Sequence, residues 1–258
     1  MLKQITIVKE NIDQGFEMPW SVYPYANYVH YGLNSPLFKV FVTSNGVVVT
    51  QYDDTLQICG KEISERDVEE VIAFAKANSI RTITGSSSSI HLLSSKTSLK
   101  NKVTYGKIIE ICIKNHSSAA KIALASTKKD YEEIAKFVVD INSASGSYYE
   151  LNQYFNQIYN RYLEHYSRNW FIKEKESIIG HIATYAEAPS YAVLGGLVVE
   201  PNHRQHGIGK DLFCTVTSSL INEGKRVYLF CFNEMLLPFY RRYALSEDDV
   251  GKLILLHE

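Results

Sequence analysis

A short apolar run that passes through a glycine-containing turn into an amphipathic helix constrains this chain more than any other feature. Every residue from Tyr191 to Val199 is apolar or small, as is typical of a strand buried on both faces. Beyond the turn, apolar residues recur at helical spacing from Ile208 to Leu220, and Gly224 is placed to end the helix. The chain therefore contains a strand, a basic turn and a helix in direct succession.

The turn is suited to bind a phosphate group. Gly207 and Gly209 have no side chains, so the first N–H groups of the helix can approach an anion closely, and the helix dipole adds partial positive charge. A P-loop would need a glycine where Arg204 stands, and a dinucleotide fingerprint would need one where Leu212 stands. What remains is the pattern R-x-x-G-x-G after V-x-P.

This pattern resembles motif A of the GNAT superfamily of N-acetyltransferases, in which the turn holds the pyrophosphate of acetyl-CoA. A second motif supports the resemblance, because Asn233 follows the next strand pattern and Tyr240 lies seven residues beyond it, as in GNAT enzymes. The resemblance covers roughly residues 118–258. It implies an α/β (α+β) fold with a mixed, mostly antiparallel central sheet flanked by helices.

The resemblance also implies acetyl-CoA as the acyl donor, without a metal. The strand backbone would pair with the pantetheine arm of CoA, and the turn would hold the pyrophosphate. The expected donor site comprises Leu197, Val198, Val199, Arg204, Gln205, His206, Gly207, Ile208, Gly209, Lys210 and Asn233. Tyr240 would protonate the departing thiolate, because a phenol with a pKa of about 10 stays protonated at neutral pH. The Val199 N–H is the expected donor to the thioester carbonyl.

The general base is left open. Histone-type members place a glutamate where this chain has Val193. Nearby candidates are Glu187, Glu200 and His181, and a water relay would also serve. The pair Gly195–Gly196 either permits a bulge in the strand or allows close packing.

Composition limits the partners. A formal net charge of −1 gives no general attraction to nucleic acids or anionic membranes. No apolar run approaches the ~20 residues of a membrane span. The four cysteines form no C-x-x-C pair, so we expect reduced thiols that fill core or strand space. These features predict a cytoplasmic protein, a monomer or a homodimer, without nucleic-acid or membrane partners.

The first half shows the element order of a GNAT domain without its own motif A. Strands are predicted over 38–43, 47–52, 56–59, 82–84 and 103–114, with helices after the capping box of Ser64 and Asp67 and from Ile90. The serines before Ile90 are either a turn or an anion site. We therefore predict a degenerate GNAT-like domain over 1–117 and a GNAT domain over 118–258, with the boundary near residues 115–118.

The second half begins like a GNAT domain. A strand is predicted over 121–126, then a helix capped by Thr127 and Asp130, and a hairpin over 170–173 and 177–186. A tyrosine-rich helix over 148–166 either lines an acceptor pocket or packs its rings against the core.

The sequence as a whole favours an acetyl-CoA-dependent N-acetyltransferase that modifies a primary amine of a small molecule or a peptide. The alternative is a non-catalytic CoA-binding regulatory protein. Retention of Tyr240 favours the enzyme.

Overall fold

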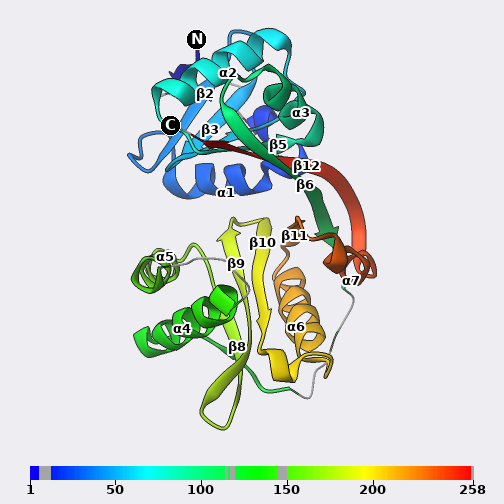
Figure 1. Cartoon of the computed structure of the whole chain (residues 1–258). Helices are drawn as coiled ribbons and strands as arrows, with labels where there is room; N and C mark the ends of the chain where they lie inside the picture. The colour runs from blue at the N-terminus through cyan, green and yellow to red at the C-terminus, as the bar shows by residue number, and fades with distance from the viewer. Residues whose placement is uncertain (6–12, 114–115, 117–119, 145–149, 257–258) are drawn as a thin grey trace. The chain divides into compact units, whose positions relative to one another are not determined.

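The computed structural model describes residues 1–5, 13–113, 116, 120–144 and 150–256 (Figure 1). They form two compact units, unit 1 with Met1–Glu110 and Phe230–Glu258, and unit 2 with Ile111–Leu229. Residues from the end of the chain belong to unit 1 because the last strand pairs with a strand of the first half. The predicted domain boundary near 115–118 lies largely outside the described residues, and the division at 117 stays a prediction.

Unit 1 contains a sheet with the strand order β1-β2-β3-β4-β5-β12-β6. Neighbouring strands from β1 to β5 are antiparallel except β4 and β5, which are parallel and are connected by α2, and β12 is antiparallel to β5. The strands are β1 (Lys3–Ile5), β2 (Phe38–Val42), β3 (Val48–Tyr52), β4 (Thr55–Ile58), β5 (Thr82–Ser86), β6 (Lys100–Ile111) and β12 (Ala244–Leu256). The α-helices are α1 (Val22–Tyr31), α2 (Glu65–Ala77), α3 (Ser87–Lys96) and α7 (Leu237–Arg241).

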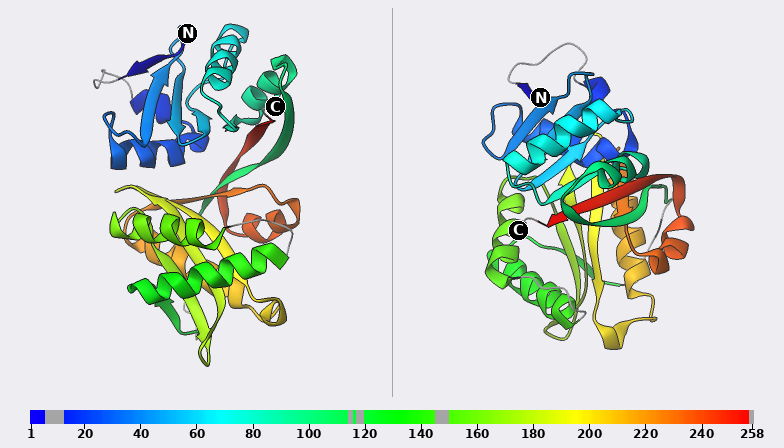
Figure 2. Two further views of the ribbon diagram at one scale, coloured as in Figure 1. Left: turned by 60° about the vertical axis from the view of Figure 1, so that its left-hand side comes forward. Right: turned by 45° about the horizontal axis from the view of Figure 1, so that its top comes forward.

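Unit 2 contains a sheet with the strand order β11-β10-β9-β8-β7. Only β10 and β11 are parallel, and α6 connects them. The strands are β7 (Ile122–Leu124), β8 (Asn169–Glu174), β9 (Ser177–Glu187), β10 (Tyr191–Val199) and β11 (Arg226–Cys231), whose last two residues belong to unit 1. The helices are α4 (Lys128–Ala144), α5 (Leu151–Leu163) and α6 (Ile208–Asn222). Helices α4 and α5 cover one face of this sheet and α6 covers the other (Figure 2).

Both halves of the chain place a parallel strand–helix–strand unit after antiparallel strands. This arrangement confirms the predicted mixed, mostly antiparallel sheet flanked by helices. The predicted elements are present, and most of their ends are shifted by a few residues. Helix α3, for example, begins at Ser87, before the predicted Ile90. Helix α1 and strands β1 and β12 were not predicted.

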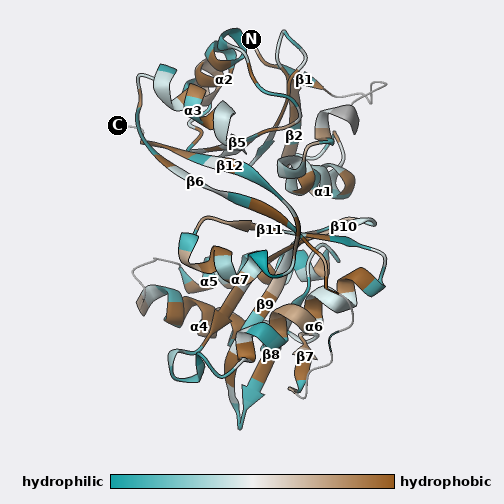
Figure 3. Ribbon diagram, turned by 90° about the vertical axis from the view of Figure 1, so that its right-hand side faces the viewer, coloured by the Kyte–Doolittle hydropathy of each residue, from teal (hydrophilic) through white to brown (hydrophobic). Residues whose placement is uncertain are grey.

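The helices of unit 2 are amphipathic, with hydrophobic and hydrophilic faces (Figure 3). Among the tyrosines of α5, Tyr154, Tyr159 and Tyr162 pack against the core that α4 shares with β8, and the Tyr162 hydroxyl donates to the Ser126 carbonyl. The described tyrosines therefore act in packing, while Tyr148 and Tyr149 lie outside the described residues.

The cysteine prediction is wrong at one position. Cys59, Cys214 and Cys231 are buried, whereas Cys112 is exposed, because it follows the end of β6. None of the four cysteines, all of which are described, forms a disulfide.

Candidate functional site

The start of α6 is open to solvent and lacks a side-chain cap. Its N-cap residue, Gly207, has φ 85°, a left-handed conformation that disfavours side chains, and no side chain bonds to the first N–H groups. A Cβ atom at Gly207 would meet no atom within 4 Å, so the glycine serves the backbone angle and leaves open space. Unpaired N–H groups at a helix start, together with the helix dipole, form a binding place for an anion.

The predicted turn residues surround this helix start. Arg204, Gln205, His206 and Lys210 are exposed, and Ile208 and Gly209 are half-buried. The Arg204 Nε atom donates to the Val199 carbonyl at 3.1 Å, which ties the turn to the end of β10. Gln205 also has a positive φ, 66°, so the turn contains two left-handed residues. The structure thus brings the predicted cationic side chains and the N–H donors together on one surface.

The corresponding helix of the first half has the opposite character. At the start of α2, the Ser64 N–H donates to the Asp67 carboxylate at 2.9 Å, and Ser64 Oγ accepts from the Asp67 N–H, which confirms the predicted capping box. Burial alone would raise the pKa of Asp67, yet the hydrogen bonds from Ser64 and its neighbours lower it below the ordinary value, so the carboxylate is charged. A bound anion would meet this negative charge. The chain therefore contains one open and one closed version of the same strand–helix junction.

The serines before Ile90 form the first turn of α3 and its N-cap. Ser86 accepts from the Ser89 N–H at 3.2 Å, so this end is a helix cap of the kind that serine commonly makes. The cap supports the interpretation as a turn.

The end of β10 separates from β11. Their parallel pairing runs from Tyr191 with Arg226 to Leu194 with Leu229, and among the described residues of unit 2 the stretch 195–199 pairs with β9 alone. The Glu200 N–H donates to the Ile179 carbonyl of β9. In an antiparallel pair the N–H and C=O groups of successive residues point alternately toward and away from the partner strand, so those of Val199 point away from β9. Val199 therefore offers its N–H on the side that an added chain could occupy. Leu197 and Val198 precede it on the same strand end.

The predicted bulge in β10 is present. Between Gly195 and Val198 the strand contains one residue more than β9, and Gly196 has φ 62°. A Cβ atom at Gly195 would collide with the ring of Tyr185, so close packing also requires this glycine. Gly196 therefore permits the bulge, and Gly195 allows close packing against Tyr185.

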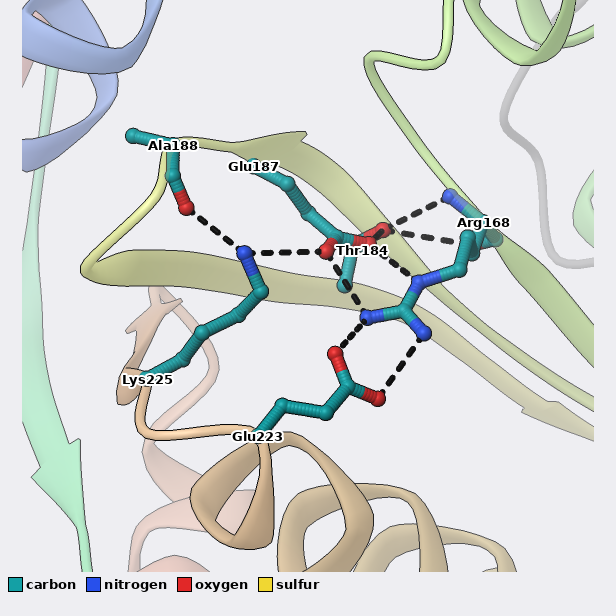
Figure 4. A network of polar contacts seen from close by, with 6 residues as sticks. All are labelled: Arg168, Thr184, Glu187, Ala188, Glu223 and Lys225. Carbon is teal, nitrogen blue, oxygen red and sulfur yellow. Dashed lines mark hydrogen bonds and ion pairs between the residues drawn. The ribbon is translucent and has the colours of Figure 1, made fainter.

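The carboxylates considered as general bases are engaged elsewhere. Arg168 makes paired hydrogen bonds to Glu187 and to Glu223, with N–O distances of 2.7–2.9 Å (Figure 4). Thr184 donates to Glu187 at 2.8 Å, and Lys225 lies 3.6 Å from the same carboxylate. The hydrogen bond to Arg168 lowers the pKa of Glu223. The network joins β9 to the C-terminal end of α6 and holds Glu187 in a structural role.

Arg168→Met is expected to lower the free energy of unfolding by about 3 kcal/mol, because Glu187 and Glu223 would lose the cation between them. Arg168→Lys should recover only part of this loss, since an ammonium group cannot make both paired contacts. Urea unfolding at neutral pH measures the difference. Equal stability of wild type and Arg168→Met would show that the network contributes nothing to folding.

His203 is held between two carboxylates beside the turn. Its Nδ1 atom lies 2.6 Å from Glu200 and its Nε2 atom lies 3.1 Å from Glu174. The bonds to Glu200 and then to Glu174 raise the pKa of His203, and the bond from His203 lowers the pKa of Glu200. These two bonds hold the single helical turn Pro201–His203, which Arg204 follows directly.

The imidazole pKa of His203 is expected above its ordinary value of 6.5, and Glu174→Gln should lower it. The contribution of His203 to stability is full below the unfolded-state pKa and is lost as the pH rises through the raised folded-state pKa. An NMR titration of the imidazole carbons measures the pKa directly. An unchanged pKa in Glu174→Gln would exclude the contact with Glu174.

The remaining predicted residues, Asn233 and Tyr240, belong to unit 1. Asn233 accepts from the Met235 N–H at 3.0 Å and so caps the single turn Glu234–Leu236. Tyr240 lies on α7 and is 8% exposed. Their roles in binding and proton transfer stay predictions.

Two residues of the site were missed in the sequence. Tyr185 is 44% exposed and lies against Gly195, and Asn169 is buried beside His181. The glycine pair was the available signal, because a strand glycine often marks the close approach of another group. Within the described residues, His, Cys, Asp and Glu side chains form no group suited to a metal ion. None of the described helices has the length and apolarity to cross a membrane.

Part of the chain is similar to a known protein family. Residues 134–244 match the Acetyltransferase (GNAT) family. No curated protein matches the chain in sequence.

Solved structures share the fold. An acetyltransferase of the GNAT family from Colwellia psychrerythraea is 16% identical, has a TM-score of 0.58, and the match covers 98% of this chain and 99% of that one. A functionally unknown conserved protein from Staphylococcus epidermidis is 15% identical with a TM-score of 0.58, over 79% of this chain and 85% of that one. A tandem GNAT protein from the clavulanic acid biosynthesis pathway is 11% identical with a TM-score of 0.51, over 100% and 99%. The GNAT fold therefore extends over both halves.

Proposed function

Because residues 134–244 match the acetyltransferase (GNAT) family, we propose that this protein transfers the acetyl group of acetyl-CoA to a primary amine of a small molecule or a peptide. The observation that carries the proposal is the uncapped start of α6 at Gly207. The closed start of α2 supports it by contrast, because there the chain satisfies the same kind of N–H groups with its own side chains.

The residues around α6 fit the phosphates of CoA. The N–H groups of residues 207–210 would bind the pyrophosphate, the side chains of Arg204 and Lys210 would add positive charge, and the His206 imidazole would add a hydrogen-bonding group. A Cβ atom at Gly209 would make one ordinary van der Waals contact, 3.4 Å from Val199, so the backbone of the turn lies close to the strand end. Asn233 is the remaining proposed contact.

The end of β10 fits the pantetheine arm, whose two amides need partners along an extended strand. Leu197, Val198 and Val199 would supply them through backbone groups, since this stretch pairs with β9 alone among the described residues of unit 2. A backbone N–H at the same place would stabilise the negative charge that develops on the thioester oxygen.

The chemistry needs two proton transfers. As the new N–C bond forms and the C–S bond breaks, the amine loses a proton and the CoA sulfur gains one. Tyr240 is the proposed donor to the sulfur. Water is the proposed acceptor from the amine, because Glu187 and Glu200 are bound to Arg168 and His203, and His181 is buried.

A non-catalytic CoA-binding regulatory protein is the second candidate. The observation that favours it is the same engagement of Glu187 and Glu200, which leaves neither of them as a ready base. The two candidates make different predictions for turnover, while both predict CoA binding.

A screen of primary amines with acetyl-CoA, read out as release of the free CoA thiol, tests the proposal. We expect release that saturates with one class of amine and yields the acetylated amine in equal amount by mass spectrometry. Binding of acetyl-CoA without amine-dependent release would favour the regulatory protein. Absence of binding would contradict both.

A further inference from the structure

The interior of unit 2 contains a histidine that hydrogen-bonds to the bulge of β10. His181 of β9 is fully buried, and its Nδ1 atom lies 2.8 Å from the Gly196 carbonyl oxygen. A carbonyl oxygen only accepts hydrogen bonds, so Nδ1 carries the ring hydrogen and donates it. Burial lowers the pKa of His181 to about 4, so the ring is neutral at physiological pH.

The second ring nitrogen is held by Asn169 of β8. A neutral ring with hydrogen on Nδ1 presents a lone pair at Nε2, which lies 2.9 Å from Asn169 Oδ1. The amide NH2 group is the partner that this lone pair needs, and a half turn of the amide plane brings it there. Asn169 is 1% exposed, so neither nitrogen of His181 has water as an alternative partner. The ring is thereby fixed in one tautomer and one orientation.

The bulge is enclosed by two rings. A Cβ atom at Gly196 would lie 3.3 Å from His181 Cε1 and 3.7 Å from Tyr185 Cε1, and one at Gly195 would collide with Tyr185. Gly196 has φ 62°, so its peptide conformation departs from that of the strand on either side. The hydrogen bond from His181 is the polar contact that selects the direction of the Gly196 carbonyl.

This direction determines where the next N–H points. In a planar trans peptide the C=O of one residue and the N–H of the following residue point in opposite directions. With the Gly196 carbonyl directed at His181, the Leu197 N–H points away from His181. Leu197 lies in the stretch that has no partner on β11 within unit 2.

We propose that His181, held by Asn169, is a positioning residue that aims the Leu197 N–H at the thioester oxygen of acetyl-CoA. The proposal rests on the proposed acetyltransferase function and makes Leu197, and not the Val199 predicted from the sequence, the donor to that oxygen. His181 itself touches no substrate. It acts through the Gly196–Leu197 peptide.

Two substitutions separate positioning from packing. In His181→Asn, the side-chain amide nitrogen can take the place of Nδ1, so the bond to Gly196 is retained. In His181→Gln, the side-chain amide oxygen reaches the place of Nε2 and accepts from Asn169, so that contact is retained and the bond to Gly196 is lost. Both variants keep a neutral polar side chain, so a purely structural role predicts similar behaviour.

The readout is the backbone amide signal of Leu197 in NMR spectra recorded with saturating CoA and with saturating acetyl-CoA. Wild type and His181→Asn should show a shift difference between the two ligands at Leu197, and His181→Gln should show none. Where an acceptor amine is known, kcat of His181→Gln should fall about 10- to 100-fold, since loss of an oxyanion donor costs about 100- to 1,000-fold and misalignment costs less. Its affinity for CoA should stay unchanged.

The outcomes distinguish the two proposals. If neither ligand shifts the amides of residues 207–210, the proposed function fails and this inference fails with it. If those amides shift but Leu197 does not distinguish acetyl-CoA from CoA in wild type, the inference alone is wrong. It is also wrong if His181→Gln behaves as wild type. Should His181→Gln fail to fold, the same comparison with Asn169→Leu, which frees the ring to rotate, decides the question.

Discussion

Gly209→Glu is expected to weaken CoA binding by at least about 100-fold, which corresponds to roughly 3 kcal/mol. The substitution places a carboxylate at the second residue of α6, where the pyrophosphate is proposed to bind, and opposing like charges in a contact cost several kcal/mol. The fold should tolerate the change, because the new Cβ atom would meet only Val199, at 3.4 Å. Isothermal titration calorimetry with CoA measures the loss.

Two control variants accompany this experiment. Arg66→Glu introduces the same side chain at the second residue of α2, whose start is closed by Ser64 and Asp67, and should leave CoA affinity unchanged. Gly209→Ala tests the steric effect without the charge and should lose far less affinity. Retained affinity in Gly209→Glu would contradict the phosphate site at α6.

Tyr240→Phe is expected to reduce kcat by about 100- to 10,000-fold, the range that a positioned general acid contributes. Removal of the hydroxyl leaves the CoA thiolate without its proposed proton donor, while the ring still fills its buried place on α7. CoA affinity should stay the same. Steady-state kinetics over a range of pH measures the effect, and the high-pH limb of the wild-type profile should disappear in the variant.

Tyr243→Phe is the matched control. This tyrosine is half-buried in the turn after α7 and, like Tyr240, contacts the ring of Phe239. It therefore tests whether removal of any tyrosine hydroxyl from this segment lowers kcat. Its kcat should stay near that of wild type. Unchanged turnover of Tyr240→Phe at all pH values would remove the proposed acid.

Local signals in the sequence were sufficient for much of the fold. The capping box of Ser64 and Asp67 placed the start of α2, and the apolar spacing after Gly207 placed α6. Helix α1 was missed because small or polar residues, among them Ala26 and Asn27, face the interior and hide the apolar periodicity. Strand β12 was missed because its partner β5 is far away in the sequence, and no local pattern specifies such pairing.

The candidate site, like the fold, could be predicted from the sequence only in part. The open turn could be predicted, because glycines at a helix start have local consequences for backbone angle and access. The engagement of Glu187 could not be predicted, since its partner Arg168 lies 19 residues earlier in the chain, just before β8. Contacts of His181 and Tyr185 with the glycine pair depend on two register shifts between β9 and β10, and each shift changes which residues face one another.

The central claim is that the start of α6 binds acetyl-CoA. The most direct test is an NMR titration of the full chain with CoA, following the backbone amides at both strand–helix junctions. We predict saturable shifts at residues 207–210 and none at residues 64–67. Shifts at α2 in place of α6, or no saturable shift at either junction, would contradict the account.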